Sequence, residues 1–211
     1  MKPLRRKLGT VAGPHPKTAA AGMAKQKSDG NANDAALAAA FTDAPLHVVG
    51  IGQGSGRGLH AADDLTYFEA TRTAAEEAYQ MADLRPADIQ FAEVHDCFSI
   101  AELLHIEDLG FFEHGTGHLA VADEMTRLDG SMPINTSGGL KCKGHPVGAT
   151  GAGQLVEVWP QLRQQAGDRQ VPGDDLRIGL AHNLGGTGGT SSVTILRRGD
   201  SVSYTHLRAH E

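Results

Sequence analysis

The chain has 211 residues, 40% of them hydrophobic, and a formal net charge of -6 at pH 7. This length allows one large domain or two small ones with a sizeable core. The acidic balance excludes the basic footprint that nucleic-acid binders need, and no run approaches the roughly 18 apolar residues that span a bilayer. We therefore expect no nucleic-acid partner and no membrane span.

Cysteine occurs only twice, at Cys97 and Cys142. Two cysteines are too few for a secreted disulfide framework, and they lack the paired spacing of a zinc site. The sequence therefore predicts no metal centre and a reducing, cytoplasmic compartment.

Both ends of the chain differ in composition from the middle. The first 27 residues hold seven basic residues and no acidic one, a bias shared by transit peptides and by disordered segments. The final SVSYTHLRAHE resembles a translated sequencing adapter. We interpret residues 1–45 as an atypical or disordered segment, residues 199–211 as a non-native tail and residues 46–198 as the folded domain.

Strand and helix patterns alternate through residues 46–198, as they do in layered α/β domains. The first stretch, LHVVGIGQGSG, predicts a short strand that runs into a glycine loop, and the helix after it has Asp64 as a candidate N-cap. One face of this helix is expected to be apolar. That face holds Leu65, Phe68, Thr71, Ala75, Ala78 and Tyr79.

A turn at Pro86 leads into a predicted strand over residues 89–94. Ser99 and Glu102 have the spacing of a capping box for the next helix, which should stop at Gly110. Residues 111–132 show little periodicity, so we interpret them as a surface excursion.

The segment SMPINTSGGLKCKGHP predicts a long loop that leads into a helix over residues 147–162. Pro146 suits the first turn of that helix, and Pro160 should bend or end it. The segment DLRIGLAHNLGGTGGTSSVTILRR then predicts two final strands joined by a glycine loop.

Three loops carry polar or reactive groups next to regular elements: residues 95–98 (HDCF), 144–146 (GHP) and 182–186 (HNLGG). Sites in layered α/β folds assemble at strand ends, because loops leave side chains and backbone amides free. We therefore expect the three loops to converge.

Cys97 has two interpretations. It precedes a predicted helix and follows His95 closely, so the helix terminus should favour its thiolate and make it a proton-transfer group. A free cysteine is also commonly a small buried hydrophobic residue.

His145 also has two interpretations, a structural residue or part of a site. Gly148, Gly151 and Gly153 follow it, and glycine inside a helix costs about 0.5–1 kcal/mol against alanine. Such residues imply a close approach by another backbone or by a ligand, and the first turn offers free N–H groups to an oxyanion.

Two further glycine runs favour neither a dinucleotide site nor a phosphate loop. GIGQGSGRG lacks the following helix and acidic partner of a dinucleotide fingerprint. Gly185 and Gly186 lie between two predicted strands, so a phosphate loop is disfavoured, and exposed backbone N–H groups for a negative oxygen are the better interpretation.

Taken together, EVHDCFSIAELLHIEDLGF, INTSGGLKCKGHPVGATGAGQ and IGLAHNLGGTGGT resemble the C-terminal half of a thiolase. The similarity is to the sterol-carrier-protein-type and archaeal-type branch, which carries a His-Asp-Cys-Phe box, and it covers residues 46–198. It implies an α/β fold: a thiolase-like C-terminal domain in which a layered mixed sheet has helices on both faces.

The resemblance implies a Claisen condensation of acyl-CoA thioesters, or thiolysis of a 3-ketoacyl-CoA, with no permanently bound cofactor. His145 would activate a nucleophilic cysteine of the N-terminal half, and His95 would help bind the thioester oxygen. Cys97 would be the acid/base. Gly185 would offer its N–H to a second oxyanion hole, with Asn183 and Phe98 beside the substrate.

Two departures from the family pattern matter. Many thiolases have a second cysteine where this chain has Asn183, so acid/base duty falls on Cys97. No counterpart of the half with the nucleophile is present, and residues 1–45 read as a remnant of it, with SDGNANDAALAAA faintly like its end. The chain alone is expected to be inactive or nearly so, to expose apolar surface and to self-associate.

Two alternatives stay open. One is a retro-aldolase that acts on a CoA-thioester side chain together with a small OB-fold partner subunit. The other is a non-catalytic thiolase-fold partner protein. Because His95, Cys97 and His145 are all present, the acyltransferase is favoured, and a homo-oligomer is expected, as in the family.

Overall fold

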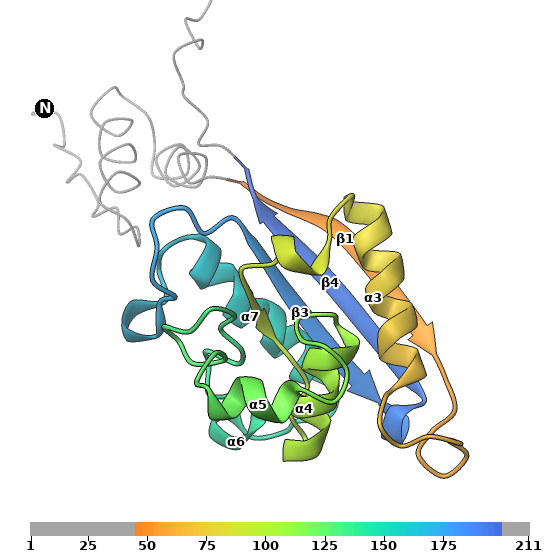
Figure 1. Cartoon of the computed structure of the whole chain (residues 1–211). Helices are drawn as coiled ribbons and strands as arrows, with labels where there is room; N and C mark the ends of the chain where they lie inside the picture. Colours follow the sequence, from red (N-terminus) through yellow and green to blue (C-terminus); the bar gives the residue numbers. More distant parts are fainter. Residues whose placement is uncertain (1–44, 200–211) are drawn as a thin grey trace, which may run out of the picture. The chain divides into compact units, whose positions relative to one another are not determined.

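A computed structural model describes residues 45–199, and the interpretations of residues 1–44 and 200–211 fall outside it. The described part contains a four-stranded sheet in the order β1-β4-β3-β2 (Figure 1). Its strands are β1 (Leu46–Ser55), β2 (Phe91–Glu93), β3 (Ile178–Gly185) and β4 (Thr190–Arg198). Antiparallel pairs join β1 to β4 and β4 to β3, and a parallel pair joins β3 to β2, so the predicted mixed sheet is confirmed.

Helices cover both faces of the sheet, as predicted (Figure 1). Successive residues of a strand point to opposite faces, and Leu180 and Ala181 of β3 belong to two different apolar clusters. The Leu180 cluster includes α3 (Glu69–Ala82), and the Ala181 cluster includes α7 (Thr150–Leu162). The core is therefore two apolar layers separated by the sheet.

Shorter helices fill the connections. They are α4 (Ser99–Asp108), α5 (Gly117–Ala122), α6 (Gly139–Lys143) and the 3-10 turns Pro86–Asp88, Gly167–Arg169 and Gly186–Gly188. The predicted end of α4 near Gly110 is confirmed, with Gly110 at φ +80°. The stretch taken as a surface excursion contains α5, and Met132 at its end is buried.

The glycine loop predicted after the first strand is wrong, because β1 continues through all three alternate glycines. A Cβ at Gly50, Gly52 or Gly54 would overlap a backbone carbonyl of α3. The missing side chains let helix and strand approach closely, so these glycines serve packing between layers. They do not form a dinucleotide loop.

Both predicted helix caps are also wrong. The N-cap residue of α4 is Phe98, and no side chain caps this helix. The Glu102 carboxylate instead accepts a hydrogen bond from the Asn135 side chain at 3.0 Å. Helix α3 begins at Glu69, with Phe68 as its N-cap residue. Asp64 lies before the helix, where it accepts a hydrogen bond from the Thr66 N–H in a local turn. Side-chain partners elsewhere in the fold therefore override the local capping pattern.

The helix predicted over residues 147–162 begins at Thr150 and ends at Leu162, with Pro160 inside it. Its glycines are less crowded than predicted. A Cβ at Gly151 would touch the Asn183 side chain, whereas one at Gly148 or Gly153 would meet nothing within 4 Å.

The close approach of β1 to α3 predicts a strong effect of one methyl group. Gly52→Ala should lower the free energy of unfolding by about 1–3 kcal/mol, since the new Cβ would overlap the Ala74 carbonyl oxygen. Gly153→Ala is the matched control, because its Cβ enters open space and alanine favours the helix. Urea unfolding of both variants tests this, and equal midpoints would contradict it.

Candidate active site

His95 and Asn183 meet because β2 and β3 run parallel. Glu93 pairs with Ala181, and two further residues along each strand bring His95 beside Asn183. The Asn183 amide nitrogen lies 3.1 Å from His95 Nδ1. Two of the three predicted loops therefore converge at the carboxyl ends of these strands.

His145 completes the convergence. Its ring centroid lies 5.0 Å from that of His95 in an edge-on arrangement, and its Nδ1 lies 2.8 Å from the Thr150 hydroxyl. That hydroxyl donates to the Pro146 carbonyl at 3.2 Å, so it accepts from Nδ1–H of the imidazole. The Nε2 of His145 then keeps its lone pair, which a general base requires.

Cys97 lies two residues after His95, in the loop that leads to α4, and its side chain is partly exposed. Burial raises the pKa of its thiol, and backbone N–H groups of Phe98 and Cys97 only partly oppose that effect. The structure thus differs from the expectation of a stabilised thiolate. A thiol that keeps its proton near neutral pH is suited to donate it.

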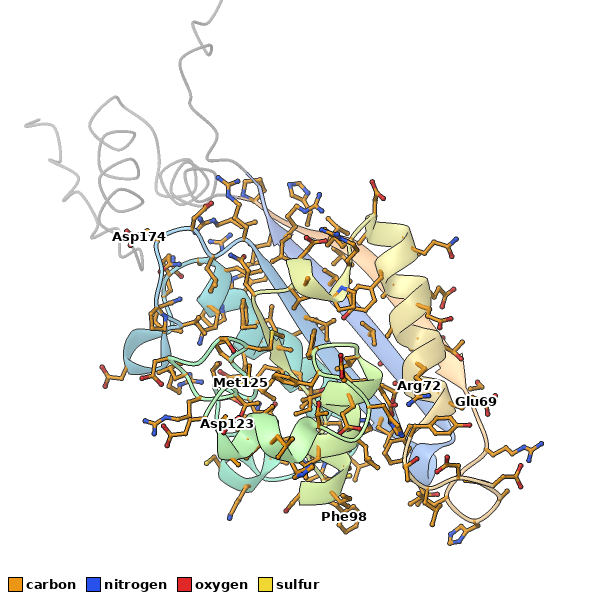
Figure 2. The ribbon with its side chains drawn as sticks, in the orientation of Figure 1. Glu69, Arg72, Phe98, Asp123, Met125 and Asp174 are labelled. Atoms are coloured by element: carbon orange, nitrogen blue, oxygen red, sulfur yellow. The ribbon has the colours of Figure 1, made fainter. Side chains whose placement is uncertain are left out.

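The remaining predicted site residues lie at the ends of the same elements. Phe98 projects outward from the start of α4 with 69% of its surface exposed (Figure 2). Gly185 ends β3, two residues beyond Asn183, and Gly186 follows at φ +57°, a conformation that favours glycine. Neither Phe98 nor Gly185 has a hydrogen bond or ring contact with His95 or His145 within residues 45–199.

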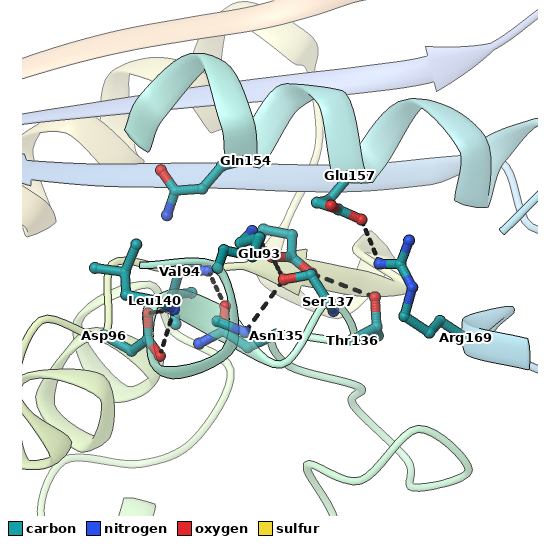
Figure 3. A network of polar contacts seen from close by, with 12 residues as sticks. Glu93, Val94, Asp96, Asn135, Thr136, Ser137, Leu140, Gln154, Glu157 and Arg169 are labelled. Atoms are coloured by element: carbon teal, nitrogen blue, oxygen red, sulfur yellow. Dashed lines mark hydrogen bonds and ion pairs between the residues drawn. The ribbon is translucent and has the colours of Figure 1, made fainter. Parts of the chain in front are cut away.

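A buried carboxylate anchors the loop before His145. Glu93 accepts from the Ser137 hydroxyl at 2.5 Å, the Ser137 backbone N–H at 3.0 Å and the Thr136 hydroxyl at 3.3 Å (Figure 3). Lys143 pairs at 3.3 Å with Oε2 of Glu93, the oxygen that also accepts from the Ser137 hydroxyl. These bonds satisfy a charge that burial would otherwise make costly.

Asp96 fixes the next part of the same loop (Figure 3). Its two oxygens accept from the Leu140 N–H at 3.0 and 3.1 Å. Gly139 sits at φ +61°, and a Cβ there would collide with the Asp96 carboxylate. Gly139 is therefore required by the close approach of the HDCF loop, whereas a Cβ at Gly138, at φ +84°, would instead meet the Cys142 side chain.

Sequence reasoning missed several residues that support the site. Thr150, Glu93 and Gln154 are buried and bond directly to its loops or to its side chains. The available signal was their polar character on otherwise apolar strand and helix faces, since buried polar groups need partners.

Two further histidines are fully buried behind the site. The His105 and His182 ring centroids lie 4.3 Å apart. Burial, and then His95, lower the pKa of His105 to about 3, while burial and the neighbouring histidines lower that of His182. Both rings are therefore neutral in the folded chain near pH 7. Among the described residues no cluster could hold a metal ion.

The Glu93 anchor predicts local loosening when it is weakened. Glu93→Gln removes the charge that pairs with Lys143 and should speed tryptic cleavage after Lys141 by about tenfold, more than cleavage after Arg72 inside α3. Glu113→Gln, at an exposed position, is the matched control. Equal cleavage after Lys141 in all three proteins would show that the anchor does not hold this loop.

The neutral histidines predict acid sensitivity. Below pH 6.5 the unfolded chain binds protons that the folded chain does not, so stability present above this pH is lost as pH falls. For each of His105 and His182 the free energy of unfolding should fall slowly between pH 7 and 6 and then approach a limiting slope of about 1.4 kcal/mol per pH unit near pH 5. Urea titrations between pH 7 and 5 measure this slope.

His105→Phe should reduce the slope by one proton, because phenylalanine keeps an aromatic ring but cannot titrate. His118→Gln changes an exposed histidine and should retain the wild-type slope. A wild-type stability that does not change over this pH range would contradict the prediction.

Known proteins resemble this chain in sequence and in fold. The model of a family described as thiolase C-terminal domain-like matches residues 53–198. Acetyl-CoA acetyltransferase of Methanothermobacter thermautotrophicus is 53% identical over 163 residues, 77% of this chain and 42% of that protein. Sterol carrier protein 2 of Oryctolagus cuniculus is 44% identical over 68% of this chain and 26% of that protein.

A solved structure titled Ltp2-ChsH2(DUF35) aldolase superposes with a TM-score of 0.66 at 25% identity. The match covers 79% of this chain and 43% of that one. The chain thus spans less than half the length of these relatives. None of the described helices combines the length and apolar character needed to cross a bilayer. The family match extends over most of the chain, and the chain belongs to the thiolase C-terminal domain-like family.

Proposed function

We propose that this chain is the C-terminal half of a thiolase-type acyltransferase, whose reaction is a Claisen condensation of acyl-CoA or the reverse thiolysis. The observation that carries the proposal is the 5.0 Å approach of the His95 and His145 rings, which come from loops 50 residues apart. With Cys97 adjacent to His95, two imidazoles and one thiol belong to one end of the sheet.

Each residue has a chemical task in this proposal. The Nε2 of His145 takes the proton of a cysteine thiol in the N-terminal half of such an enzyme, and that cysteine then accepts an acyl group from CoA. Cys97 moves the proton at the α-carbon of the second thioester. His95 and the N–H of Gly185 stabilise the two negative oxygens, a role in which each donor is worth about 10²–10³ in rate.

Large apolar side chains on and beside α7 are exposed, as expected of a surface that binds another polypeptide. Val147, Val156 and Trp159 are 82%, 66% and 49% exposed, and the last two lie on the face of α7 away from the sheet. An exposed apolar patch of this kind marks an interaction site. The relatives are more than twice as long as the matched region, so an N-terminal half of the same fold family is the proposed occupant.

The second candidate is a retro-aldolase, because the solved neighbour's title names an aldolase and a DUF35 component. In that reaction a 3-hydroxyacyl-CoA would break between its second and third carbons, and an OB-fold partner subunit would be required. The presence of His95, Cys97 and His145 together favours the acyltransferase. A non-catalytic thiolase-fold partner protein is the third candidate.

Thiolysis of a short 3-ketoacyl-CoA tests the proposal. The chain alone should give no turnover above background. Residues 46–198 grafted in place of the matching part of the Methanothermobacter acetyltransferase should restore it, and Cys97→Ala should then lower kcat by about 10²–10⁴-fold. Cys142→Ala, at the exposed cysteine, is the matched control.

The outcomes separate the candidates. An active graft that is insensitive to Cys97→Ala would contradict the assigned acid/base. A graft that folds, lacks thiolysis and, with an OB-fold partner subunit added, releases a carbonyl product from a 3-hydroxyacyl-CoA would favour the retro-aldolase. A folded graft without either activity would favour the non-catalytic partner.

A further inference from the structure

We propose that the Gln154–Asn183 amide pair is a positioning device that holds His95 in the neutral tautomer with its proton on Nε2. In that form the ring can only donate from Nε2, the role that an oxyanion-hole histidine requires. The inference rests on the proposed function for its purpose, although the tautomer itself is a property of the free chain.

The direction of the hydrogen bonds is fixed by a backbone carbonyl, which can only accept. The His182 carbonyl lies 2.7 Å from Gln154, so the NH2 group of Gln154 must face it. The oxygen of Gln154 then faces Asn183 at 3.0 Å and must accept from its NH2 group. The orientation of both amides follows without any choice between nitrogen and oxygen.

The same NH2 group of Asn183 lies 3.1 Å from Nδ1 of His95. An amide nitrogen has only protons to offer, so Nδ1 must supply the lone pair. A neutral imidazole with an unprotonated Nδ1 carries its proton on Nε2. Within residues 45–199 the Nε2 of His95 has no hydrogen-bond partner, so it is available to a ligand.

A backbone donor holds the same strand end from the other side of the sheet. The N–H of His95 donates to Nδ1 of His182 at 3.5 Å, and Nε2 of His182 lies 3.2 Å from the Thr71 hydroxyl. Two adjacent residues of β3 therefore form hydrogen bonds with His95, His182 with its backbone N–H and Asn183 with its ring. The ring is fixed in position as well as in tautomer.

The charge state agrees with this geometry. Burial, and then the neighbouring His145, lower the pKa of His95, while Asp96 opposes them. The ring is therefore neutral near pH 7, and its tautomer decides whether Nε2 donates or accepts. Asn183 occupies the position at which many thiolases have a second cysteine. In this chain that position has an amide that orients the histidine.

The test is ring-nitrogen NMR of the full chain with ¹⁵N-labelled histidine, with His95 assigned by signal loss in His95→Gln. In the wild type at pH 7 we expect a protonated Nε2 and a lone-pair Nδ1. Asn183→Asp should protonate Nδ1, because a carboxylate only accepts. A protonated Nδ1 in the wild type, or an unchanged ring in Asn183→Asp, would overturn the proposal.

The second residue of the pair has its own variant. Gln154→Leu frees Asn183 to turn and should mix the two tautomers. Unchanged His95 signals in Gln154→Leu would count against a role for the Gln154–Asn183 amide pair. The His145 ring is hydrogen-bonded to Thr150, so its signals report whether each variant is folded. Gln154→Leu tests the proposal by itself if Asn183→Asp does not fold.

The readout requires no substrate, so its failure is distinguishable from failure of the proposed function. If NMR finds the predicted His95 tautomer but the graft lacks acyl-transfer activity, only the proposed function is contradicted. An active graft in which His95 has the opposite tautomer would contradict only the role proposed for the Gln154–Asn183 amide pair. In an active graft, Asn183→Asp should lower kcat by about 10²–10³-fold, the usual effect of losing one oxyanion donor.

Discussion

The parallel pairing of β2 with β3 is the constraint on which the site depends. Parallel strands end at the same edge of a sheet, and the Glu93–Ala181 register brings His95 beside Asn183. A slip by one residue would turn each side chain to the other face. Because β2 has only three residues, its register needs support, and the segment 133–135 on its other side bonds to Ala92 in both directions.

The sheet also explains how polar groups are held inside an apolar fold. His182 and Asn183 are neighbours in β3, so they point to opposite faces. His182 reaches Thr71 on the α3 side, and Asn183 reaches Gln154 on the α7 side. Both helices are needed to satisfy these groups, because an unpaired buried polar group costs about 1–3 kcal/mol. The packing of the core and the geometry of the site are therefore one problem.

Much of this arrangement is predictable from the sequence. His95 and Asn183 were predicted from polar residues at strand ends and His145 from its loop before a helix, and their convergence follows from how α/β sheets are built. The α/β class and helices on both faces were predictable for the same reason. Alternation between strand and helix patterns leaves few other architectures.

The failures have tertiary causes. Gly50, Gly52 and Gly54 look like a loop because local composition cannot reveal that α3 lies against them. Glu102 looks like part of a capping box, but its carboxylate accepts a hydrogen bond from Asn135, which is 33 residues away in sequence. Burial of Cys97 outweighs the helix terminus that was expected to lower its pKa. In each case a partner distant in sequence decides the outcome, and one sequence does not identify it.

The described residues thus form a folded half that brings two histidines together and leaves an apolar helix face exposed. Its central feature is the meeting of the HDCF and GHP loops. A nuclear Overhauser effect between the ring protons of His95 and His145 measures this directly. With centroids 5.0 Å apart a strong cross-peak is expected, and its absence in a folded chain with both rings assigned would contradict the assembled site.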